Sequence, residues 1–350
     1  MNIINVTASA SYDVIIGKGI MHEIGKYCKE IGSPNKVVII SDTNVWGLYG
    51  ANTVKNLETA GLSVYNFVFE AGEESKNANT YLSILNYLAQ KQITRSDMLI
   101  ALGGGVVGDI TGFAAATYLR GIAYIQVPTT LLAMVDSSVG GKTAIDLPAG
   151  KNLVGAFYQP RLVLCDTEAL NTLPDNIFRD GCAEVIKYGV LYDEKLFSHL
   201  SAQGICFDRE SVISRCVELK RNVVSEDEFD NGARQMLNLG HTIGHSIEKE
   251  SNFTISHGQA VAIGMAIVSK AGAAYGICKP ETHSDIVSIL GTFGLPVTTN
   301  YTCQTLYVNA LSDKKRSGGV VNLIVPQKIG TCVIKPTPVE ELETFIEAGL

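Results

Sequence analysis

Histidines in the second half of the chain have a spacing that could hold a metal ion. The sequence contains six histidines, and His241, His245 and His257 fall within one 17-residue stretch. A helix would place His241 and His245, four residues apart, on one face, which is a spacing that metal ligands use. His257 stands beside a glycine at the expected start of the next helix. Surface or helix-capping histidines are the alternative, and the third histidine makes a metal site the better prediction.

A carboxylate would complete a site with three protein ligands and open positions. Glu184 is a candidate because its segment, GCAEVIK, is otherwise largely apolar. Its alternative role is an ion pair with Lys187, three residues later on a helix surface. Spacing alone does not separate Glu184 from Glu168, Glu218 or Glu248, and it does not say which two histidines bind the metal.

A glycine-rich segment in the first half could hold a phosphate. Residues 97–109 read DMLIALGGGVVGD, which predicts a strand, a G-x-G-x-x-G loop from Gly103 and a helix. Glycines let backbone N–H groups approach a phosphate, and a helix N-terminus adds its positive dipole end. The acid that usually follows about 20 positions later is absent, since the next one after Asp109 is Asp136. Asp42, after an earlier strand, could bind a ribose instead; a tight turn needed only for packing is the alternative.

A second glycine segment, DSSVGGKT at 136–143, ends like a Walker A loop. That motif requires glycine where Asp136 stands, so we exclude a P-loop ATPase. Lys142 is then available as a cation for a phosphate or a carboxylate.

The elements that must position these residues change in type along the chain. β-rich runs predict strands at 36–40, 63–69, 97–102 and 123–127, and helical spacing predicts helices at 77–91 and 109–120. This alternation favours a mostly parallel sheet. Later segments have helical periodicity at 178–192, 210–227, 233–250, 259–275 and 281–293, and strand signals nearly vanish until 320–325. We therefore expect an α/β domain over 1–175 and a mainly α-helical domain over 176–350.

Composition narrows the function classes. With 46% apolar and 18% charged residues, the chain is not disordered, and a net charge of −7 gives no basic field for nucleic acid or an anionic membrane. The eight cysteines form no C-x-x-C pair, which excludes zinc ribbons and thioredoxin-type motifs. Reduced thiols and the lack of a signal-peptide pattern predict a cytoplasmic protein. Residues 286–312 contain no Asp, Glu, Lys or Arg, but their proline, asparagine and glutamine residues make the segment too polar for a membrane span.

Several segments together are similar to those of the 3-dehydroquinate synthase family. They are GGGVVGD at 103–109, PTTLL at 128–132, DSSVGGKT at 136–143, GKN at 150–152, AEVIK at 183–187, LNLGHTIGH at 237–245, HG at 257–258 and DKK at 313–315. The resemblance covers nearly the whole chain in order. Other sugar-phosphate cyclases share much of it, and iron-dependent alcohol dehydrogenases and glycerol dehydrogenases share the architecture more distantly.

The resemblance implies a Rossmann-like N-terminal α/β domain that holds NAD, an α-helical C-terminal domain that holds one divalent metal (Zn²⁺ or Co²⁺), and an active site in the interdomain cleft. The implied reaction converts 3-deoxy-D-arabino-heptulosonate 7-phosphate to 3-dehydroquinate and phosphate, the second step of the shikimate pathway, and regenerates NAD in each turnover. A related sugar-phosphate cyclase and a metal-dependent polyol dehydrogenase are the alternatives.

The resemblance also implies residue roles. The metal ligands would be Glu184, His241 and His257, which makes His245 a substrate or proton-relay residue. The NAD positions would be Asp42, Asn44, Gly72, Glu73, Lys76, Gly104, Gly105, Val106, Val107, Gly108, Asp109, Thr129, Thr130, Lys142, Lys151, Asn171 and Thr172.

The substrate is a phosphorylated acid, so several cations are needed. Lys142, Asn152 and Lys187 would face its phosphate, and Arg234, Asn238 and Lys314 would face its carboxylate and hydroxyls. Lys220 stands at another family position for a cation, and Asp136 would orient a hydroxyl or a lysine. Arg120 resembles a residue that reaches the phosphate site of the neighbouring subunit, which implies a functional homodimer.

One position departs from the family pattern. Many relatives have His-Gly-Glu after the third ligand, whereas this chain has Gln259 there. Glutamine keeps hydrogen bonding but loses a charge, so a bond behind the metal ligands can differ.

Overall fold

The computed structural model describes residues 1–314 and 319–350, without the side chains of residues 312–314. The chain forms two compact units, one of residues 1–173 and 209–229 and one of residues 174–208 and 230–350. Helix α8 (Arg209–Glu226) thus belongs to the first unit, although it follows the expected boundary at 175/176 in sequence. The limits 1–175 and 176–350 stay a prediction about folding domains.

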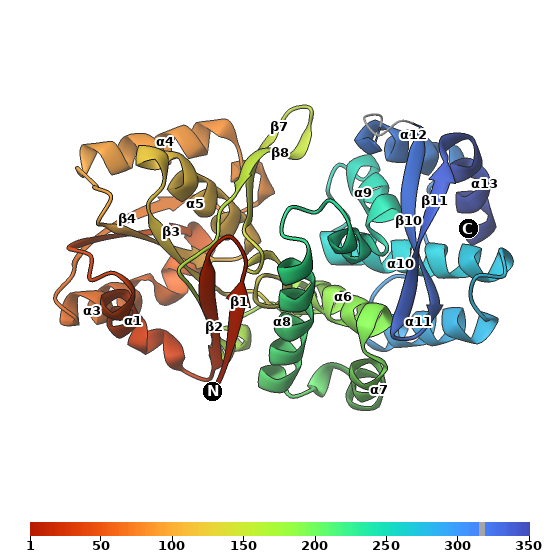
Figure 1. The fold of residues 1–350 in the computed structure, drawn as a ribbon, viewed down its shortest axis with the longest axis horizontal. Helices are drawn as coiled ribbons and strands as arrows, with labels where there is room; N and C mark the ends of the chain where they lie inside the picture. The colour runs from red at the N-terminus through yellow and green to blue at the C-terminus, as the bar shows by residue number, and fades with distance from the viewer. Residues whose placement is uncertain (315–318) are drawn as a thin grey trace. The chain divides into compact units, whose positions relative to one another are not determined.

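The first unit is built on a seven-stranded sheet with the order β1-β2-β9-β6-β5-β3-β4 (Figure 1). Its strands are β1 (Asn2–Thr7), β2 (Ser11–Gly17), β3 (Lys36–Asp42), β4 (Ser63–Phe69), β5 (Met98–Gly103), β6 (Ala123–Pro128) and β9 (Leu162–Asp166). β1 pairs antiparallel with β2, and the other neighbours in this sheet pair parallel. The mostly parallel sheet that the sequence predicts is confirmed.

Strand β3 shows why its sequence is a continuous apolar run. Val37 and Ile39 enter the core on one face of the sheet, and Val38 and Ile40 enter the core on the other. Because helices cover both faces, successive side chains are all buried. The covering helices are α1 (Ile24–Ile31) and α3 (Ala51–Thr59) on the first face, and α4 (Ala78–Gln90) and α5 (Gly105–Thr117) on the second.

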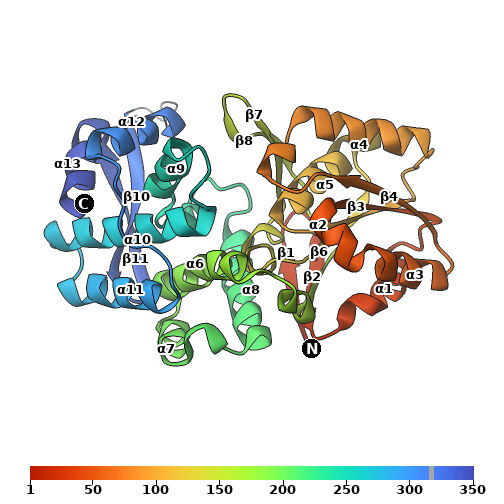
Figure 2. The same cartoon turned by 180° about the vertical axis from the view of Figure 1, so that it is seen from behind.

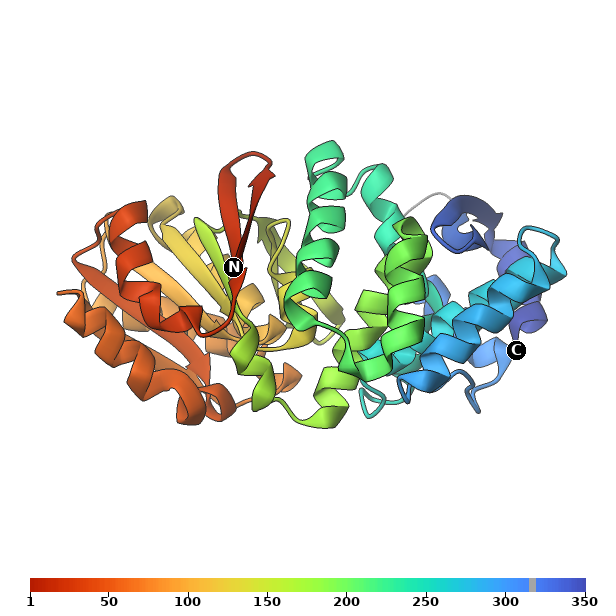
Figure 3. The ribbon, with the colours of Figure 1, turned by 90° about the horizontal axis from the view of Figure 1, so that it is seen from below.

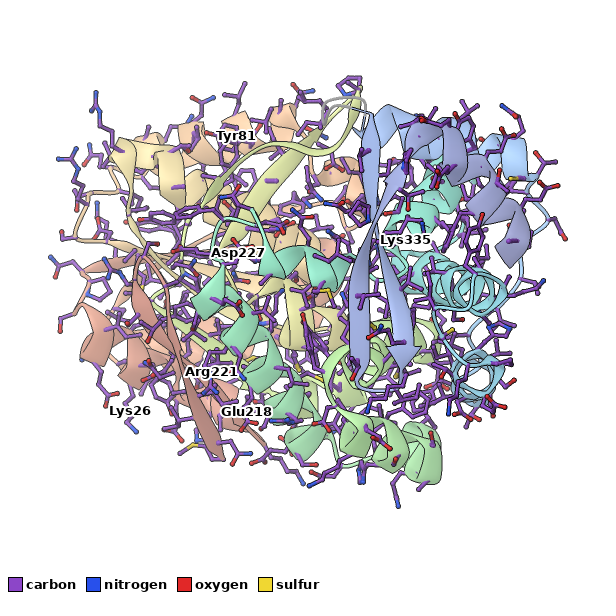
Figure 4. The ribbon with its side chains drawn as sticks, turned by 45° about the vertical axis from the view of Figure 1, so that its right-hand side comes forward. Lys26, Tyr81, Glu218, Arg221, Asp227 and Lys335 are labelled. Carbon is purple, nitrogen blue, oxygen red and sulfur yellow. The ribbon has the colours of Figure 1, made fainter. Side chains whose placement is uncertain are left out.

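Further elements complete the first unit. A hairpin of β7 (Lys142–Leu147) and β8 (Gly150–Phe157) projects beyond the main sheet (Figure 1). Helix α8 lies beside the β1–β2 hairpin (Figure 3), and its outward side carries Glu218 and Arg221 (Figure 4). The short segments are η1 (Ile20–Glu23), α2 (Thr43–Val45), η2 (Trp46–Gly50), η3 (Glu73–Ser75), η4 (Tyr118–Arg120), η5 (Ala133–Ser137) and η6 (Thr167–Asn171).

The second unit is mainly helical. Its elements are α6 (Asp175–Tyr192), α7 (Glu194–Gln203), η7 (Gly204–Cys206), η8 (Ala233–Asn238), α9 (His241–Glu250), α10 (His257–Ala274), α11 (Pro280–Thr292), α12 (Cys303–Lys314), β10 (Val320–Lys328), β11 (Thr331–Pro338) and α13 (Val339–Gly349). Helix α10 packs against α6, α9, α11 and α13 (Figure 2). It is apolar on nearly every side, as expected for a central buried helix. The predicted fold class, an α/β unit with a mainly helical second part, is confirmed.

The helix predicted over 233–250 is wrong as a single element. Residues Ala233–Asn238 form a 3₁₀ turn, and α9 begins only at His241. Gly240 adopts a left-handed conformation with φ 78°, and a Cβ there would lie 2.6 Å from the backbone oxygen of Val261. The close approach of α10 therefore requires a break that helical periodicity does not reveal.

One helix boundary and one strand of the second unit also differ from expectation. Helix α5 starts at Gly105 rather than Asp109, so the glycine segment itself forms the first helical turn. Strand β11 was not predicted, because Pro336 and Pro338 weaken its strand signal. It nevertheless pairs antiparallel with β10.

None of the helices in the described ranges combines the length and the apolar character that a bilayer span requires.

Candidate metal centre and cofactor loop

Three side chains of the second unit form a group with metal-ligand geometry. Glu184 lies on α6, while His241 and His257 are the first residues of α9 and α10. Nε2 of each histidine lies 3.5 Å from Oε1 of Glu184. Two ligands bound about 2.1 Å from a tetrahedral zinc ion lie about 3.4 Å apart. The two nitrogens and one oxygen therefore fit a divalent metal with a position left for a substrate oxygen.

The Nδ1 atom of each of these two histidines already has a hydrogen-bond partner. His241 Nδ1 lies 3.0 Å from the backbone oxygen of Leu239, and His257 Nδ1 lies 3.1 Å from Oε2 of Glu248. For the neutral imidazole, both acceptors favour the tautomer in which Nδ1 donates its hydrogen and Nε2 has the lone pair that a metal ion needs. Glu248, which the sequence offered only as a rival ligand, thus holds the His257 ring.

The surroundings shift the pKa values of the two histidines in opposite directions. Burial and the Lys187 ammonium lower the pKa of His241 to about 3, so its imidazole is neutral. Burial also opposes a charge on His257, but Glu184 and Glu248 outweigh it and raise the pKa of His257 to about 10. The same carboxylates would stabilise a bound cation.

The four glutamates left open by the sequence lie in different places. Glu168 pairs with Lys18, and Glu218 pairs with Arg215, both on the surface of the first unit. Glu184 is fully buried and contacts Lys187 as well as the histidines. Glu248 belongs to a second possible group with His245 and His257. Since Glu248 accepts from His257 Nδ1, the group containing Glu184 suits Nε2 coordination better.

In the first unit, the glycine segment brings two strand ends together. β5 ends at Gly103 and β6 at Pro128, and Thr129 N donates to the backbone oxygen of Gly103 at 3.0 Å. A Cβ on Gly104 would lie 3.1 Å from Thr130, and one on Gly105 would lie 3.2 Å from Ser137. The glycines therefore allow the α5 N-terminus to approach the loop after β6, and the first N–H groups of a helix, which lack intrahelical partners, suit an anion.

One side-chain atom in the loop after β6 is suited to bind a ligand. Thr129 Oγ1 is buried and has no hydrogen-bond partner among the described residues. A buried hydroxyl without a partner is costly, so it fits a polar ligand that completes the loop. Asp42, at the end of β3, uses its carboxylate to accept from Val45 N at the start of α2.

Three predicted site residues form one cluster in the first unit. Lys76 Nζ donates to Asp109 Oδ2 at 2.5 Å and to Asn152 Oδ1 at 2.6 Å. Asn152 has φ 55° and donates its backbone N–H to Asp146. Burial raises the pKa of Asp109, although the nearby Lys76 opposes this shift. Burial alone would lower the pKa of Lys76, but the carboxylate of Asp109 outweighs it, so the pKa of Lys76 is raised. The cluster fixes the β7–β8 hairpin at the start of α5.

A second pair joins distant parts of the sequence. Lys220 on α8 contacts Asp136, with Nζ 2.7 Å from Oδ1. Lys142 begins strand β7 instead of a helix, so its segment lacks the order of a P-loop.

The remaining predicted residues of the first unit lie in turns. Lys151 lies 3.6 Å from Glu73, beside Gly72 with φ 125°. Asn171 Oδ1 accepts from Arg209 at 2.7 Å, and Thr172 contacts the Tyr49 hydroxyl.

In the second unit, Lys187 and Arg234 are buried, Asn238 ends η8 and His245 is exposed on α9. Lys314 ends α12, and its side chain lies outside the described part of the chain.

Comparison with solved structures defines the class. The chain matches 2-deoxy-scyllo-inosose synthase, solved with carbaglucose-6-phosphate, NAD⁺ and Co²⁺, with a TM-score of 0.90 and 25% identity over 100% of both chains. It matches 2-epi-5-epi-valiolone synthase from Streptomyces hygroscopicus, solved with NAD⁺ and Zn²⁺, with a TM-score of 0.89 and 24% identity over 99% of this chain and 98% of that one. The fold is that of the sugar-phosphate cyclases.

The sequence comparisons identify one family within this class. Family models described as 3-dehydroquinate synthase N-terminal and C-terminal match residues 66–180 and 181–316. Proteins named 3-dehydroquinate synthase from Clostridium acetobutylicum and Pelobacter propionicus are each 46% identical, over 96% of this chain and 95% and 96% of theirs. The chain belongs to the 3-dehydroquinate synthase family, and the family resemblance of its motifs is confirmed.

Proposed function

We propose that this protein converts 3-deoxy-D-arabino-heptulosonate 7-phosphate to 3-dehydroquinate and phosphate, the second step of the shikimate pathway. The observation that carries the proposal is the buried group of Glu184, His241 and His257, with both Nε2 atoms 3.5 Å from the carboxylate, in a chain of this family. A related cyclase and a polyol dehydrogenase are less favoured, because the solved 2-deoxy-scyllo-inosose synthase and glycerol dehydrogenase are 25% and 17% identical to this chain, below the 46% of the relatives named 3-dehydroquinate synthase.

Glu184, His241 and His257 would hold one Zn²⁺ or Co²⁺ ion. When bound, such an ion lowers the pKa of a coordinated secondary alcohol, and NAD accepts and returns its hydride. Leu239 and Glu248 orient the two imidazoles, and His245 would relay a proton at the substrate.

NAD would bind at the carboxyl edge of the parallel sheet, as dinucleotides do in such folds. The support is the glycine-lined N-terminus of α5 and the buried hydroxyl of Thr129. The residues assigned to it are Asp42, Asn44, Gly72, Glu73, Lys76, Gly104, Gly105, Val106, Val107, Gly108, Asp109, Thr129, Thr130, Lys142, Lys151, Asn171 and Thr172.

The substrate carries a phosphate and a carboxylate, and the assigned cations suit both. Lys187, which contacts Glu184, and Arg234 are 1% and 2% exposed, so both bring positive charge into the interior of the second unit. Lys142, Asn152 and Lys187 would bind the phosphate. Arg234, Asn238 and Lys314 would bind the carboxylate and hydroxyls. Asp136 and Lys220, already paired, would orient a substrate hydroxyl.

The active form would be a homodimer in which Arg120 reaches the phosphate site of the other subunit. Arg120 is exposed, and Leu119, Arg120 and Gly121 have φ values of 51°, 67° and 122°. Such consecutive positive values are strained for ordinary residues and often mark functional turns.

A cytoplasmic location is also part of the proposal. Cys28, Cys165 and Cys278 are buried free thiols and Cys206 is an exposed one, as expected in a reducing compartment.

The test is phosphate release from the purified protein with Zn²⁺ and NAD. We expect the protein to release phosphate from 3-deoxy-D-arabino-heptulosonate 7-phosphate and to release none from glucose 6-phosphate. Release only from the hexose phosphate would favour a related cyclase, and NADH formation from glycerol would favour a dehydrogenase.

A further inference from the structure

Asp180 connects the helix that carries Glu184 to the start of the helix that carries His257. It lies on α6, one turn before Glu184. Its carboxylate accepts hydrogen bonds from Ser256 Oγ and, through Oδ1 at 3.1 Å, from Gln259 N. Ser256 is the N-cap residue of α10, and His257 is the first residue of that helix.

This arrangement replaces the usual cap. The first N–H groups of a helix lack intrahelical partners, and the N-cap side chain normally accepts from one of them. Ser256 makes no side-chain cap bond to its own helix. Instead, its hydroxyl donates to Asp180, and Asp180 accepts the Gln259 N–H. The cap of α10 is therefore supplied from α6, and a negative charge there also suits the helix dipole.

The two helices meet closely at the same point. A Cβ on Gly258 would lie 2.0 Å from the backbone oxygen of Asp180 and 2.7 Å from its Oδ1. Only glycine permits this contact, so α6 and the first turn of α10 have one defined separation. Across the same two helices, Glu184 Oε1 lies 3.5 Å from His257 Nε2.

We propose that Asp180 is a positioning residue for the metal centre: by capping α10 from α6, it fixes the separation of Glu184 and His257. The inference rests on the proposed metal site, and it assigns to Asp180 no contact with the metal or the substrate. Glu248 holds the His257 ring, whereas Asp180 holds the backbone from which that ring projects.

The experiment compares Asp180→Ala with Asp180→Asn. Alanine removes the acceptor, whereas asparagine keeps an oxygen that can accept the Gln259 N–H. Zn²⁺ affinity is measured by competition with a chelator, and coordination by the visible absorption of bound Co²⁺. Losing a group that orients a ligand typically weakens metal binding about 10–100-fold. We expect that loss and an altered Co²⁺ spectrum for Asp180→Ala, and affinity within a few-fold of wild type for Asp180→Asn.

Asp193→Ala is the matched control. Asp193 caps α7 in the same unit by accepting from Lys195 N and Leu196 N at 3.0 and 3.1 Å, and α7 carries no ligand of the metal group. Its loss should lower the melting temperature and leave the Zn²⁺ affinity and the Co²⁺ spectrum unchanged.

The outcomes distinguish a failure of the positioning role of Asp180 from a failure of the proposed metal site. Wild-type affinity and spectrum in Asp180→Ala, or equal weakening in Asp193→Ala, would overturn the positioning role while the proposed metal site stands. Should Asp180→Ala fail to fold, Ser256→Ala decides, since unchanged affinity in that variant overturns the role and weaker binding supports it. A wild-type protein that binds neither ion would overturn the metal site and this inference together.

Discussion

At the scale of single residues, we expect two buried carboxylates to serve the proposed metal centre in different ways. Glu184 lies within ligand distance of both histidine Nε2 atoms. Glu248 accepts from His257 Nδ1 instead. A carboxylate behind a histidine orients the ring and raises its basicity, whereas a carboxylate in front shares the ion. The two roles should differ in how strongly each side chain affects metal affinity.

Glu184→Ala should therefore weaken Zn²⁺ binding by more than about 100-fold, beyond the usual effect of a residue behind a ligand, whereas Glu248→Ala should weaken it by about 10–100-fold. Chelator competition and metal content after dialysis measure both. Glu218→Ala, which removes a surface partner of Arg215, is the control and should bind like wild type. The reverse order, with Glu248→Ala the more severe change, would make His245, Glu248 and His257 the ligands.

Two cysteines that differ in solvent exposure, Cys28 and Cys206, provide a test of the described core. Burial raises the pKa of Cys28 to about 12, so almost no thiolate exists at pH 8, while Cys206 is exposed. Iodoacetamide at pH 8 should modify Cys206 in the native protein and reach Cys28 only after unfolding. Peptide mass spectrometry follows both sites, and rapid native modification of Cys28 would contradict the described core.

The types of the site residues were predictable from sequence, but their grouping was not. Spacing identified three histidines and four candidate glutamates. It could not choose Glu184, because α6 and α10 meet through tertiary packing around Asp180 and Gly258. The i, i+4 pair His241 and His245 is real on α9, with ring centroids 5.4 Å apart. Only the family resemblance pointed from that pair to His257.

At the scale of elements, the turn before α9 decides where His241 lies. Gly240 has φ 78°, and a Cβ there would meet the backbone of α10. Without this break, residues 233–250 would continue as one helix, and His241 would not be the first residue of α9.

Gly240→Ala should lower the free energy of unfolding more than Gly276→Ala, measured by urea denaturation. Gly276 has φ 67° and open space around its Cβ position, so alanine costs only the left-handed strain of about 1–2 kcal/mol. Gly240→Ala adds overpacking of about 1–3 kcal/mol. Equal losses in the two variants would contradict the close contact between the turn and α10.

The sequence predicted strands β3, β4, β5, β6 and β10 and the longer helices, whereas β1, β2 and β9 of the main sheet and helices α1, α3, α7, α12 and α13 were not predicted. Strands β3, β4, β5 and β6 carry continuous apolar or β-branched runs, which are strong local signals. The β7–β8 hairpin lacks such a signal, because much of β8 is exposed and is held by Lys76 through Asn152. Helix α8 was predicted as a helix, but periodicity does not say with which unit it packs.

At the scale of the whole molecule, the proposed homodimer predicts how mixed subunits behave. If Arg120 acts in the neighbouring site, Arg120→Ala and His257→Ala proteins should each be nearly inactive. Mixed and refolded together, they should recover about a quarter of wild-type activity, because half of the dimers contain one intact site. Each variant refolded alone is the control. No recovery in mixtures that form heterodimers would place Arg120 in its own subunit's site. Wild-type activity of the Arg120→Ala protein alone would place Arg120 outside catalysis.

The most direct test of the proposed reaction is the number of turnovers per NAD. Phosphate release from 3-deoxy-D-arabino-heptulosonate 7-phosphate is measured with Zn²⁺ and with NAD far below the substrate concentration, while NADH absorbance is followed in the same cuvette. Because the hydride returns within each turnover, we expect many phosphates released per NAD and no accumulation of NADH. Phosphate release that stops at one equivalent of NAD, with a matching rise in NADH, would contradict the internal redox cycle.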